Sequence, residues 1–266
     1  MSRITETMER LRREKKSALA IFLTGGDPSL AASRDLILAA AGAGADIIEI
    51  GVPFSDPLAD GPVIQRSFHR AIKAGASVNS LLKLVESVRK ETDIPLVFMI
   101  ATTLVINHGV ERFMKDSAKA GVDGIILPDA PLEEAAEFVP SARAAGLDTI
   151  FLAAPTSTPQ RLKSLARLST GFLYYISVSG VTGGKSATAA DVGAYIRKAR
   201  KVSKAPVLAG FGVKTPEQAK ALSKVADGVI IGSAAVDIAA SAKKKSAAVE
   251  ALAGFVGSVR KAMDSR

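Results

Sequence analysis

The chain has 266 residues, of which 48% are hydrophobic, and it carries a formal net charge of +9. This length and apolar content are enough for a large buried core in one sizeable domain or two small ones. The sequence contains no cysteine, which excludes disulfides, thiolate catalysis and cysteine-ligated zinc, and its two histidines argue against a histidine-rich metal site. No apolar run approaches the roughly 20 residues of a membrane span, and the N-terminal stretch MSRITETMERLRREKK lacks the apolar core of a signal peptide. We therefore expect a cytoplasmic protein.

The positive charge is concentrated in three stretches, RLRREKK, IRKARKVSK and SAKKKS, each in or beside a helical pattern. A positive balance suits a nucleic acid, an acidic partner or an anionic small substrate. None of the three stretches contains interleaved aromatic residues of the kind that stack on bases. Solvated helix faces account for them better than nucleic-acid binding, for which the sequence has no motif.

Along the chain, short runs rich in β-branched residues alternate with longer segments of helical periodicity. The predicted strands are residues 18–24, 46–50, 95–100, 124–127, 148–153, 172–177, 206–210 and 228–232. Helical patterns separate them, for example at residues 29–44, 79–92, 132–146 and 215–225. Continuous apolar runs are typical of parallel strands covered on both faces, and eight βα units in about 250 residues match a closed barrel.

We therefore predict an α/β fold, a single (β/α)8 TIM barrel domain over residues 1–266 with an extra N-terminal helix. An open doubly wound sheet is the alternative, and it is less favoured because no GxGxxG motif follows the first strand.

Glu49 closes the second apolar run, at the start of the stretch EIGVPFSDPLADGP. In a barrel the active site forms at the carboxyl ends of the strands. If Ile48 and Ile50 pack under the helices, strand alternation directs Glu49 into the barrel mouth. Asp60 follows in the next loop, and two carboxylates in different surroundings can divide acid and base roles. The alternative is structural: Glu49 forms an ordinary salt bridge and the loop aspartates cap turns.

Two further features lie near strand ends. Asp129, in LPDAP, is a third carboxylate, which we interpret as an N-cap or turn residue ahead of the following helix. Glycine-rich turns (GVTGGKS, GFGV and GSA) follow the last three predicted strands. Their free backbone N–H groups favour a phosphate cradle over simple tight turns, because barrels often bind phosphate at this place.

The apolar part of a ligand would then contact side chains at strand ends: Phe22, Ile100, Tyr174, Tyr175 and Phe211. The residues together favour a lyase, isomerase or aldolase that acts on a phosphorylated ligand without a metal or a bound redox cofactor.

Over essentially its full length the chain resembles the tryptophan synthase α subunit family. The motifs that carry the resemblance are FLTGGDP, IEIGVPFSDPLADGPVIQ, GVDGIILPDAPLEE, SGVTGGKS and AGFGV followed by IIGSA. The resemblance implies retro-aldol cleavage of indole-3-glycerol phosphate to indole and glyceraldehyde 3-phosphate. It implies that Glu49 is the acid/base that protonates indole C3 and that Asp60 binds the indole N–H. It also implies that Thr182, in the SGVTGGKS loop, positions Asp60 when that loop closes. The other implied substrate contacts are Phe22, Ile64, Tyr174, Gly183, Phe211, Gly212, Gly232 and Ser233.

The resemblance also implies a partner, a pyridoxal-phosphate (PLP) β subunit in an α-β-β-α heterotetramer, and no cofactor in this chain. Pro53, Asp56 and Pro57 would contact that subunit. After the third strand the family usually has an aromatic-rich segment with Tyr and Asn, but here the segment runs from Ala101 to Thr103 as Ala-Thr-Thr. This departure leaves one alternative open, a weakly active or inactive subunit that mainly binds and activates the β subunit. A separate alternative is another phosphate-handling barrel enzyme that acts on a sugar phosphate.

Overall fold

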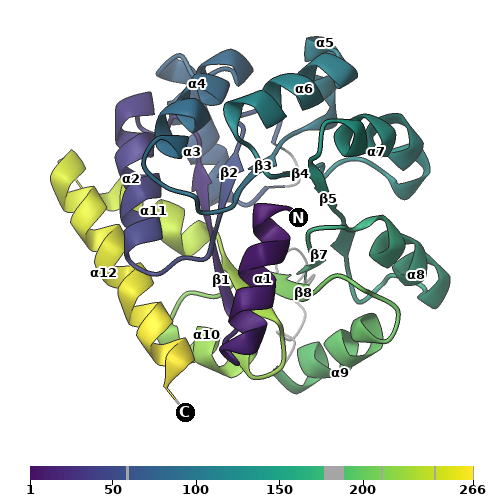
Figure 1. Ribbon diagram of the computed structural model, residues 1–266. Helices are drawn as coiled ribbons and strands as arrows, with labels where there is room; N and C mark the ends of the chain where they lie inside the picture. The colour runs from purple at the N-terminus through teal and green to yellow at the C-terminus, as the bar shows by residue number, and fades with distance from the viewer. Residues whose placement is uncertain (58–59, 177–188, 211, 243, 266) are drawn as a thin grey trace.

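The strands form one parallel sheet that closes into a barrel (Figure 1). The computed structural model describes residues 1–57, 60–176, 189–210, 212–242 and 244–265, with the backbone alone for 189–191. The described strands are β1 (Ala18–Thr24), β2 (Ile47–Gly51), β3 (Leu96–Met99), β4 (Gly124–Ile126), β5 (Asp148–Ile150), β6 (Leu152–Ala153), β7 (Leu173–Ile176), β8 (Val207–Gly210) and β9 (Gly228–Ile231). Their order is β5-β4-β3-β2-β1-β9-β8-β7-β6. Because β5 and β6, at the two ends of this order, are consecutive in the chain, the sheet closes on itself and the predicted barrel is confirmed.

The predicted strand 148–153 is divided at Phe151, which corrects the sequence interpretation. β5 pairs with β4, whereas β6 pairs with β7. The Phe151 N–H donates to the Ser169 hydroxyl at 3.2 Å instead of to a neighbouring strand, and its carbonyl accepts from the Tyr174 N–H at 3.0 Å. The chain thus changes partner strand at this residue, and the barrel closes here.

Helices surround the barrel and separate successive strands, except between β5 and β6. They are α1 (Arg3–Arg13), α2 (Leu30–Gly42), α3 (Pro62–Lys73), α4 (Val78–Arg89), α5 (Thr102–His108), α6 (Val110–Ala120), the 3-10 helix η1 (Leu132–Glu134), α7 (Ala135–Ala144), α8 (Pro159–Leu168), α9 (Ala189–Arg200), α10 (Pro216–Ser223), α11 (Ser233–Ser241) and α12 (Lys245–Asp264). Five of the described helices start at a hydroxyl side chain that accepts a first-turn N–H: Ser2, Ser29, Ser77, Thr158 and Thr215. Within the described residues, no helix has the length and apolar character to cross a membrane.

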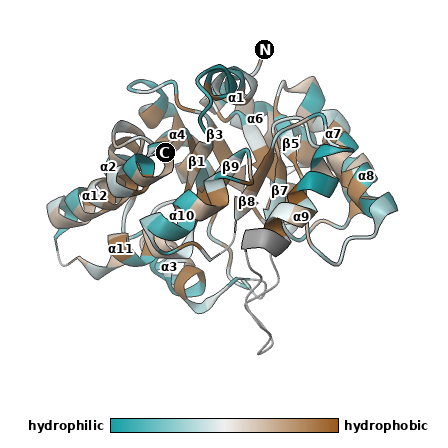
Figure 2. Cartoon of the chain, turned by 90° about the horizontal axis from the view of Figure 1, so that it is seen from below, coloured by the Kyte–Doolittle hydropathy of each residue, from teal (hydrophilic) through white to brown (hydrophobic). Residues whose placement is uncertain are grey.

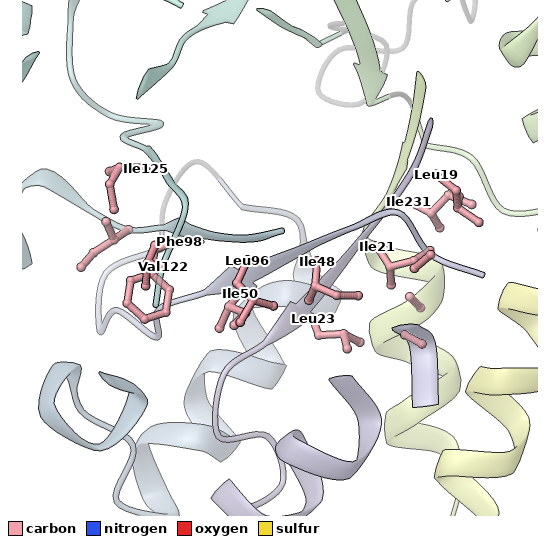
Figure 3. Packing of buried hydrophobic residues seen from close by; sticks show 14 of the residues in the cluster. Leu19, Ile21, Leu23, Ile48, Ile50, Leu96, Phe98, Val122, Ile125 and Ile231 are labelled. Carbon is pink, nitrogen blue, oxygen red and sulfur yellow. The ribbon is translucent and has the colours of Figure 1, made fainter. Parts of the chain in front are cut away.

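The hydrophobic core has two layers, because residues alternate between the faces of each strand. The outer layer lies between strands and helices; Figure 3 shows Ile48 and Ile50 there beside Leu23. The inner layer fills the barrel with side chains from the opposite strand faces: Ala18, Ala20, Ile47, Val97, Ile126, Ile150, Phe172, Leu208 and Ile230. In Figure 2 the central strands are mostly hydrophobic and the outer helices carry the hydrophilic residues.

The predicted N-terminal helix is α1, which covers the amino-terminal end of the barrel (Figure 1). Its buried stripe of Ile4, Met8 and Leu11 joins the inner layer. Arg3 donates to Asp123 at 3.0 Å and Arg10 to Asp46 at 3.3 Å, which ties the helix to the strand starts. Since α1 covers one end, the candidate site belongs at the other, where the strands reach their carboxyl ends.

Candidate active site

Glu49 lies inside the barrel near the carboxyl end of β2 and has no exposed surface. Ile48 and Ile50 belong to the outer layer and Ile47 to the inner layer, so the expected inward direction of Glu49 is confirmed. Both of its carboxyl oxygens lack a hydrogen-bond partner among the described residues. Burial without a partner raises the pKa of Glu49 to about 8, because the charged form is poorly solvated there. The carboxyl group is therefore mostly protonated at neutral pH.

An apolar cluster lies at the same rim, and we call it the rim cluster. It contains buried Phe22, Ile64, Phe68 and Val236, with Phe54, Val63 and Met99 partly buried against them. Phe22 is the β1 residue in register with Glu49. Its ring needs a glycine at position 51, since a Cβ there would lie 2.3 Å from Phe22 Cζ. The predicted contacts Phe22 and Ile64 are thus brought together from β1 and α3.

Tyr174 reaches the same space from β7. Burial raises its pKa well above the usual value, and the negative charges of Glu49 and Asp60 raise it further, which places Tyr174 within electrostatic reach of both carboxyl groups. Gly210 makes room for it, because a Cβ there would lie 2.4 Å from Tyr174 Oη. Three titratable groups therefore converge from two strands and one loop.

Asp60 occupies the loop that leads into α3, in surroundings unlike those of Glu49. It is only partly buried, and burial raises the pKa of its carboxyl group. Its backbone N–H donates to the Pro57 carbonyl at 3.1 Å. No hydrogen bond to its carboxylate is seen within the described residues, so the carboxylate is available to a ligand. The rim thus carries one enclosed carboxyl group and one more open carboxylate, and their different surroundings suit them to different roles.

Only some of the residues predicted to bind phosphate are described in the structure. Gly212 is exposed with φ +51°, a left-handed conformation that favours glycine. Gly232 is the N-cap of α11 and Ser233 its exposed first residue, and no side chain among the described residues caps this end. First-turn N–H groups without a side-chain cap suit an anion. Thr182, Gly183 and Phe211 lie outside the described residues.

Two residues expected in the ligand pocket lie elsewhere. Ile100 and Tyr175 are 1% exposed and belong to the outer layer, between strands and helices. Tyr175 stacks on Tyr195 of α9 with ring centroids 4.5 Å apart. The prediction was wrong for both because strand alternation turns them away from Met99 and Tyr174, their neighbours in the sequence.

Asp129 has a different partner from the one predicted. Its carboxylate accepts the Thr102 backbone N–H at 3.0 and 3.1 Å and the Thr102 hydroxyl at 2.8 Å. The cap of η1, the next helical element after Asp129, is Pro131. Asp129 therefore caps α5 of the preceding βα unit, and it ties the loop after β4 to the Ala101–Thr103 segment.

The residues expected to contact a partner differ in exposure. Asp56 is exposed, with its carboxylate accepting the Ser55 hydroxyl at 2.8 Å, and Pro57 is partly exposed. Pro53 is buried, so its ring offers little surface to another subunit. Of the three, Asp56 and Pro57 remain accessible.

Several contacts around α3 were missed by the sequence interpretation. Gln65 donates to the carbonyls of Asp60 and Pro57, Ser67 bonds to Thr24, and Arg70 pairs with Asp27. The only local signal was the spacing of Ser67 and Arg70, which puts both on one face of a helix. No group of three or more histidine, aspartate or glutamate side chains suited to a metal ion occurs in the described parts of the chain.

Comparison with known proteins places this barrel in a family. The family described as tryptophan synthase alpha chain matches residues 8–264. The tryptophan synthase alpha chain of Methylibium petroleiphilum is 45% identical over 100% of this chain and 97% of its own, and that of Geotalea daltonii is 49% identical over 89% of each. The crystal structure of tryptophan synthase subunit alpha from Legionella pneumophila superposes with a TM-score of 0.93 at 33% identity, covering 99% of both chains. A chain of Mycobacterium tuberculosis tryptophan synthase in its aminoacrylate-bound form gives 0.88 at 33% identity over 99% of this chain and 100% of that chain. The chain therefore belongs to the tryptophan synthase alpha chain family.

Proposed function

We propose that the chain is a lyase of tryptophan biosynthesis that cleaves indole-3-glycerol phosphate to indole and glyceraldehyde 3-phosphate. The observation that carries this proposal is the buried, protonated Glu49, which faces the same space as Asp60 and Tyr174. A retro-aldol cleavage needs a proton donor at the ring carbon and a base at the adjacent hydroxyl. One carboxyl group with a pKa near neutrality can serve as both.

Glu49 moves the protons. It gives its proton to C3 of the indole ring, which places a positive charge on the ring, largely at its nitrogen. The bond between C3 and the glyceryl carbon then breaks, and its electron pair returns to the ring. The hydroxyl on that glyceryl carbon loses its proton to the Glu49 carboxylate as the aldehyde forms, so that Glu49 ends the cycle protonated, as it began.

Asp60 stabilises the charged ring. Its carboxylate accepts the indole N–H and opposes the positive charge that develops after protonation at C3. The rim cluster supplies the apolar surface for the ring through Phe22 and Ile64. The phosphate group binds at Gly212, Gly232 and Ser233, where the N-terminus of α11 favours an anion.

The proposal includes a partner. Indole passes to a β subunit that holds PLP, within an α-β-β-α heterotetramer, and this chain itself needs no cofactor. Asp56 and Pro57 are the accessible residues of the loop after β2 that would contact that subunit. We place the complex in the cytoplasm and treat residues 1–266 as a single barrel domain. No contact in the described part of the rim favours the inactive alternative.

The test is indole release from indole-3-glycerol phosphate, with and without a PLP-containing β subunit. Glu49→Gln should lower the turnover number at least roughly 100-fold, because the amide neither gives nor takes a proton. Glu86→Gln, an exposed residue on α4, is the matched control and should behave as wild type. Turnover by Glu49→Gln at the wild-type rate would contradict the proposal. Preferential binding of a sugar phosphate over indole-propanol phosphate would instead indicate a different phosphate-handling enzyme.

A further inference from the structure

Gln65 holds the backbone on both sides of the Asp60 loop. It lies at the end of the first turn of α3, and its side-chain amide donates to the carbonyl of Asp60 at 2.8 Å and to that of Pro57 at 3.3 Å. The two N–H donors of one amide group thus join two points of the loop. The Asp60 N–H adds a third bond, to the same Pro57 carbonyl, at 3.1 Å. The position of Asp60 therefore depends on where α3 places Gln65.

Two polar contacts fix α3 to the end of β1 and to the loop that follows it. Thr24 and Ser67 are buried, with their hydroxyl oxygens 2.6 Å apart. Ser67 donates its proton to the Ile64 carbonyl at 2.7 Å, so Thr24 is the donor between the two hydroxyls. Each of these buried hydroxyls donates one hydrogen bond. A shift of the helix would leave a donor or an acceptor unpaired, so the pair favours one position of the helix.

The second contact is a bidentate ion pair one turn further along the helix. Arg70 donates from Nε to Asp27 Oδ1 at 2.8 Å and from its terminal nitrogen to Oδ2 at 2.7 Å. Asp27 is 7% exposed, so the pair is largely shielded on the carboxylate side. Two parallel hydrogen bonds fix the orientation of the guanidinium as well as its distance. The helix is thereby prevented from rotating about the Thr24–Ser67 contact.

The apolar side of α3 meets the candidate ligand site. Ile64 and Phe68 belong to the rim cluster with Phe22 of β1 and Val236 of α11. A single helix therefore contacts the ring-binding wall, the helix whose N-terminus is proposed to bind phosphate, and the loop that carries Asp60.

We propose that α3 is the element that positions Asp60 for catalysis, with Gln65 and Arg70 as positioning residues. This inference rests on the function proposed above. Reacting groups must be held closely, since a misplacement of about 1 Å costs on the order of 100-fold in rate. Gln65 acts through the loop backbone, and Arg70 acts through the helix that carries Gln65.

The experiment measures kcat and KM for indole release in four variants. Gln65→Ala should lower kcat roughly 10- to 100-fold with a smaller change in KM, because the ring-binding wall and the phosphate contacts remain. Gln65→Glu should lose activity similarly, since a carboxylate has the same shape but cannot donate to the two carbonyls. Gln160→Ala, exposed on α8, and Arg66→Ala, exposed one turn before Arg70, are the matched controls and should retain wild-type kcat.

Arg70 is tested together with its partner. A single replacement would leave the buried Asp27 carboxylate unpaired, so the double variant Asp27→Asn with Arg70→Met removes both charges. It should lower kcat with KM changed less, as Gln65→Ala does. A double variant with wild-type kcat would remove Arg70 from the proposal.

The pH profile separates positioning from general destabilisation. Asp60 acts as an anion, and its pKa is raised by burial while Glu49 and Tyr174 face the same space. If the loop loosens, Asp60 gains water and its pKa falls toward the ordinary value, so the acid limb of kcat/KM in Gln65→Ala should move to lower pH. A variant that only lost stability would keep the wild-type limb.

Failure of the inference and failure of the proposed function give different results. Wild-type protein without indole release, in the presence of the β subunit, would overturn the proposed function. Hydrogen exchange at the Asp60 amide would then still test the positioning role, with faster exchange expected in Gln65→Ala than in Gln160→Ala. Equal exchange in both variants, or wild-type kcat in Gln65→Ala, would overturn the inference.

Discussion

Replacing Glu49 by glutamine should change how the stability of the protein depends on pH. Glu49 is fully buried without a hydrogen-bond partner in the described residues, and burial raises its pKa from 4.5 to about 8. Below pH 4.5 the carboxyl group is protonated in both the folded and the unfolded chain. Between pH 4.5 and 8 the unfolded chain releases a proton that the folded chain keeps, so the free energy of unfolding falls as pH rises. Above pH 8 both states are ionised and the decrease ends.

The expected magnitude follows from the pKa values. Wild-type protein should lose about 4 kcal/mol of unfolding free energy between pH 5 and pH 8.5 through this one group. Glutamine has nearly the same shape and no charge at either pH. Its buried amide costs some free energy of its own, about 1–3 kcal/mol if no partner is found, but this cost is the same at both pH values.

The assay is urea denaturation of wild type and Glu49→Gln at pH 5 and pH 8.5. The chain has no tryptophan, so far-UV circular dichroism is the suitable signal. All other titrating groups are common to the two proteins. The change with pH in the difference between their free energies of unfolding therefore reports Glu49 alone. We expect the variant to gain about 4 kcal/mol relative to wild type at the higher pH.

A difference between the two proteins that stays constant from pH 5 to pH 8.5 would refute the reasoning. It would mean that Glu49 is solvated or paired in solution and ionises near its ordinary pKa. The proton-transfer role given to Glu49 would then lose its physical basis, even if the variant were inactive.

Three further substitutions test the geometry of the rim. Gly51→Ala should cost about 1–3 kcal/mol in thermal denaturation and raise KM, because its Cβ would lie 2.3 Å from the Phe22 ring; wild-type values in both assays would disprove the contact. Asp129→Ala should lower the free energy of unfolding by about 1–3 kcal/mol through the unpaired N–H and hydroxyl of Thr102, whereas Asp129→Asn, which keeps one acceptor oxygen, should cost less. Asp60→Asn should reduce indole release while its Tm at pH 7 stays equal to or above that of wild type, because burial disfavours the charge it removes; a clearly lower Tm would argue for a structural role.

The barrel could be predicted because its strands are mostly buried on both faces, which leaves a continuous apolar run in the sequence. The run 18–24 matches β1, and the other strands begin or end within a residue or two of the prediction. The division at Phe151 could not be foreseen in this way. It depends on the hydroxyl of Ser169, eighteen residues away, and hydrogen bonds at such distance leave no periodic pattern.

The same limit applies to the candidate site. The direction of Glu49 follows from alternation along a single strand, which is a local property. Asp129 meets Thr102 of the preceding βα unit, twenty-seven residues away, and the role of Gln65 depends on how α3 lies on the barrel. Such partners are set by packing between distant segments, so they are seen only in the folded structure.

The position of α1 has a consequence for how the chain folds during synthesis. α1 precedes every strand in the chain, yet its buried stripe packs among residues that extend as far as Ile230. Ser2 bonds to Asp148 and Arg3 to Asp123, both far downstream. The surface that receives α1 is complete only after β9 has been added to the sheet. Because α1 leaves the ribosome before the described strands of the barrel, its apolar stripe stays unprotected until β9 has emerged.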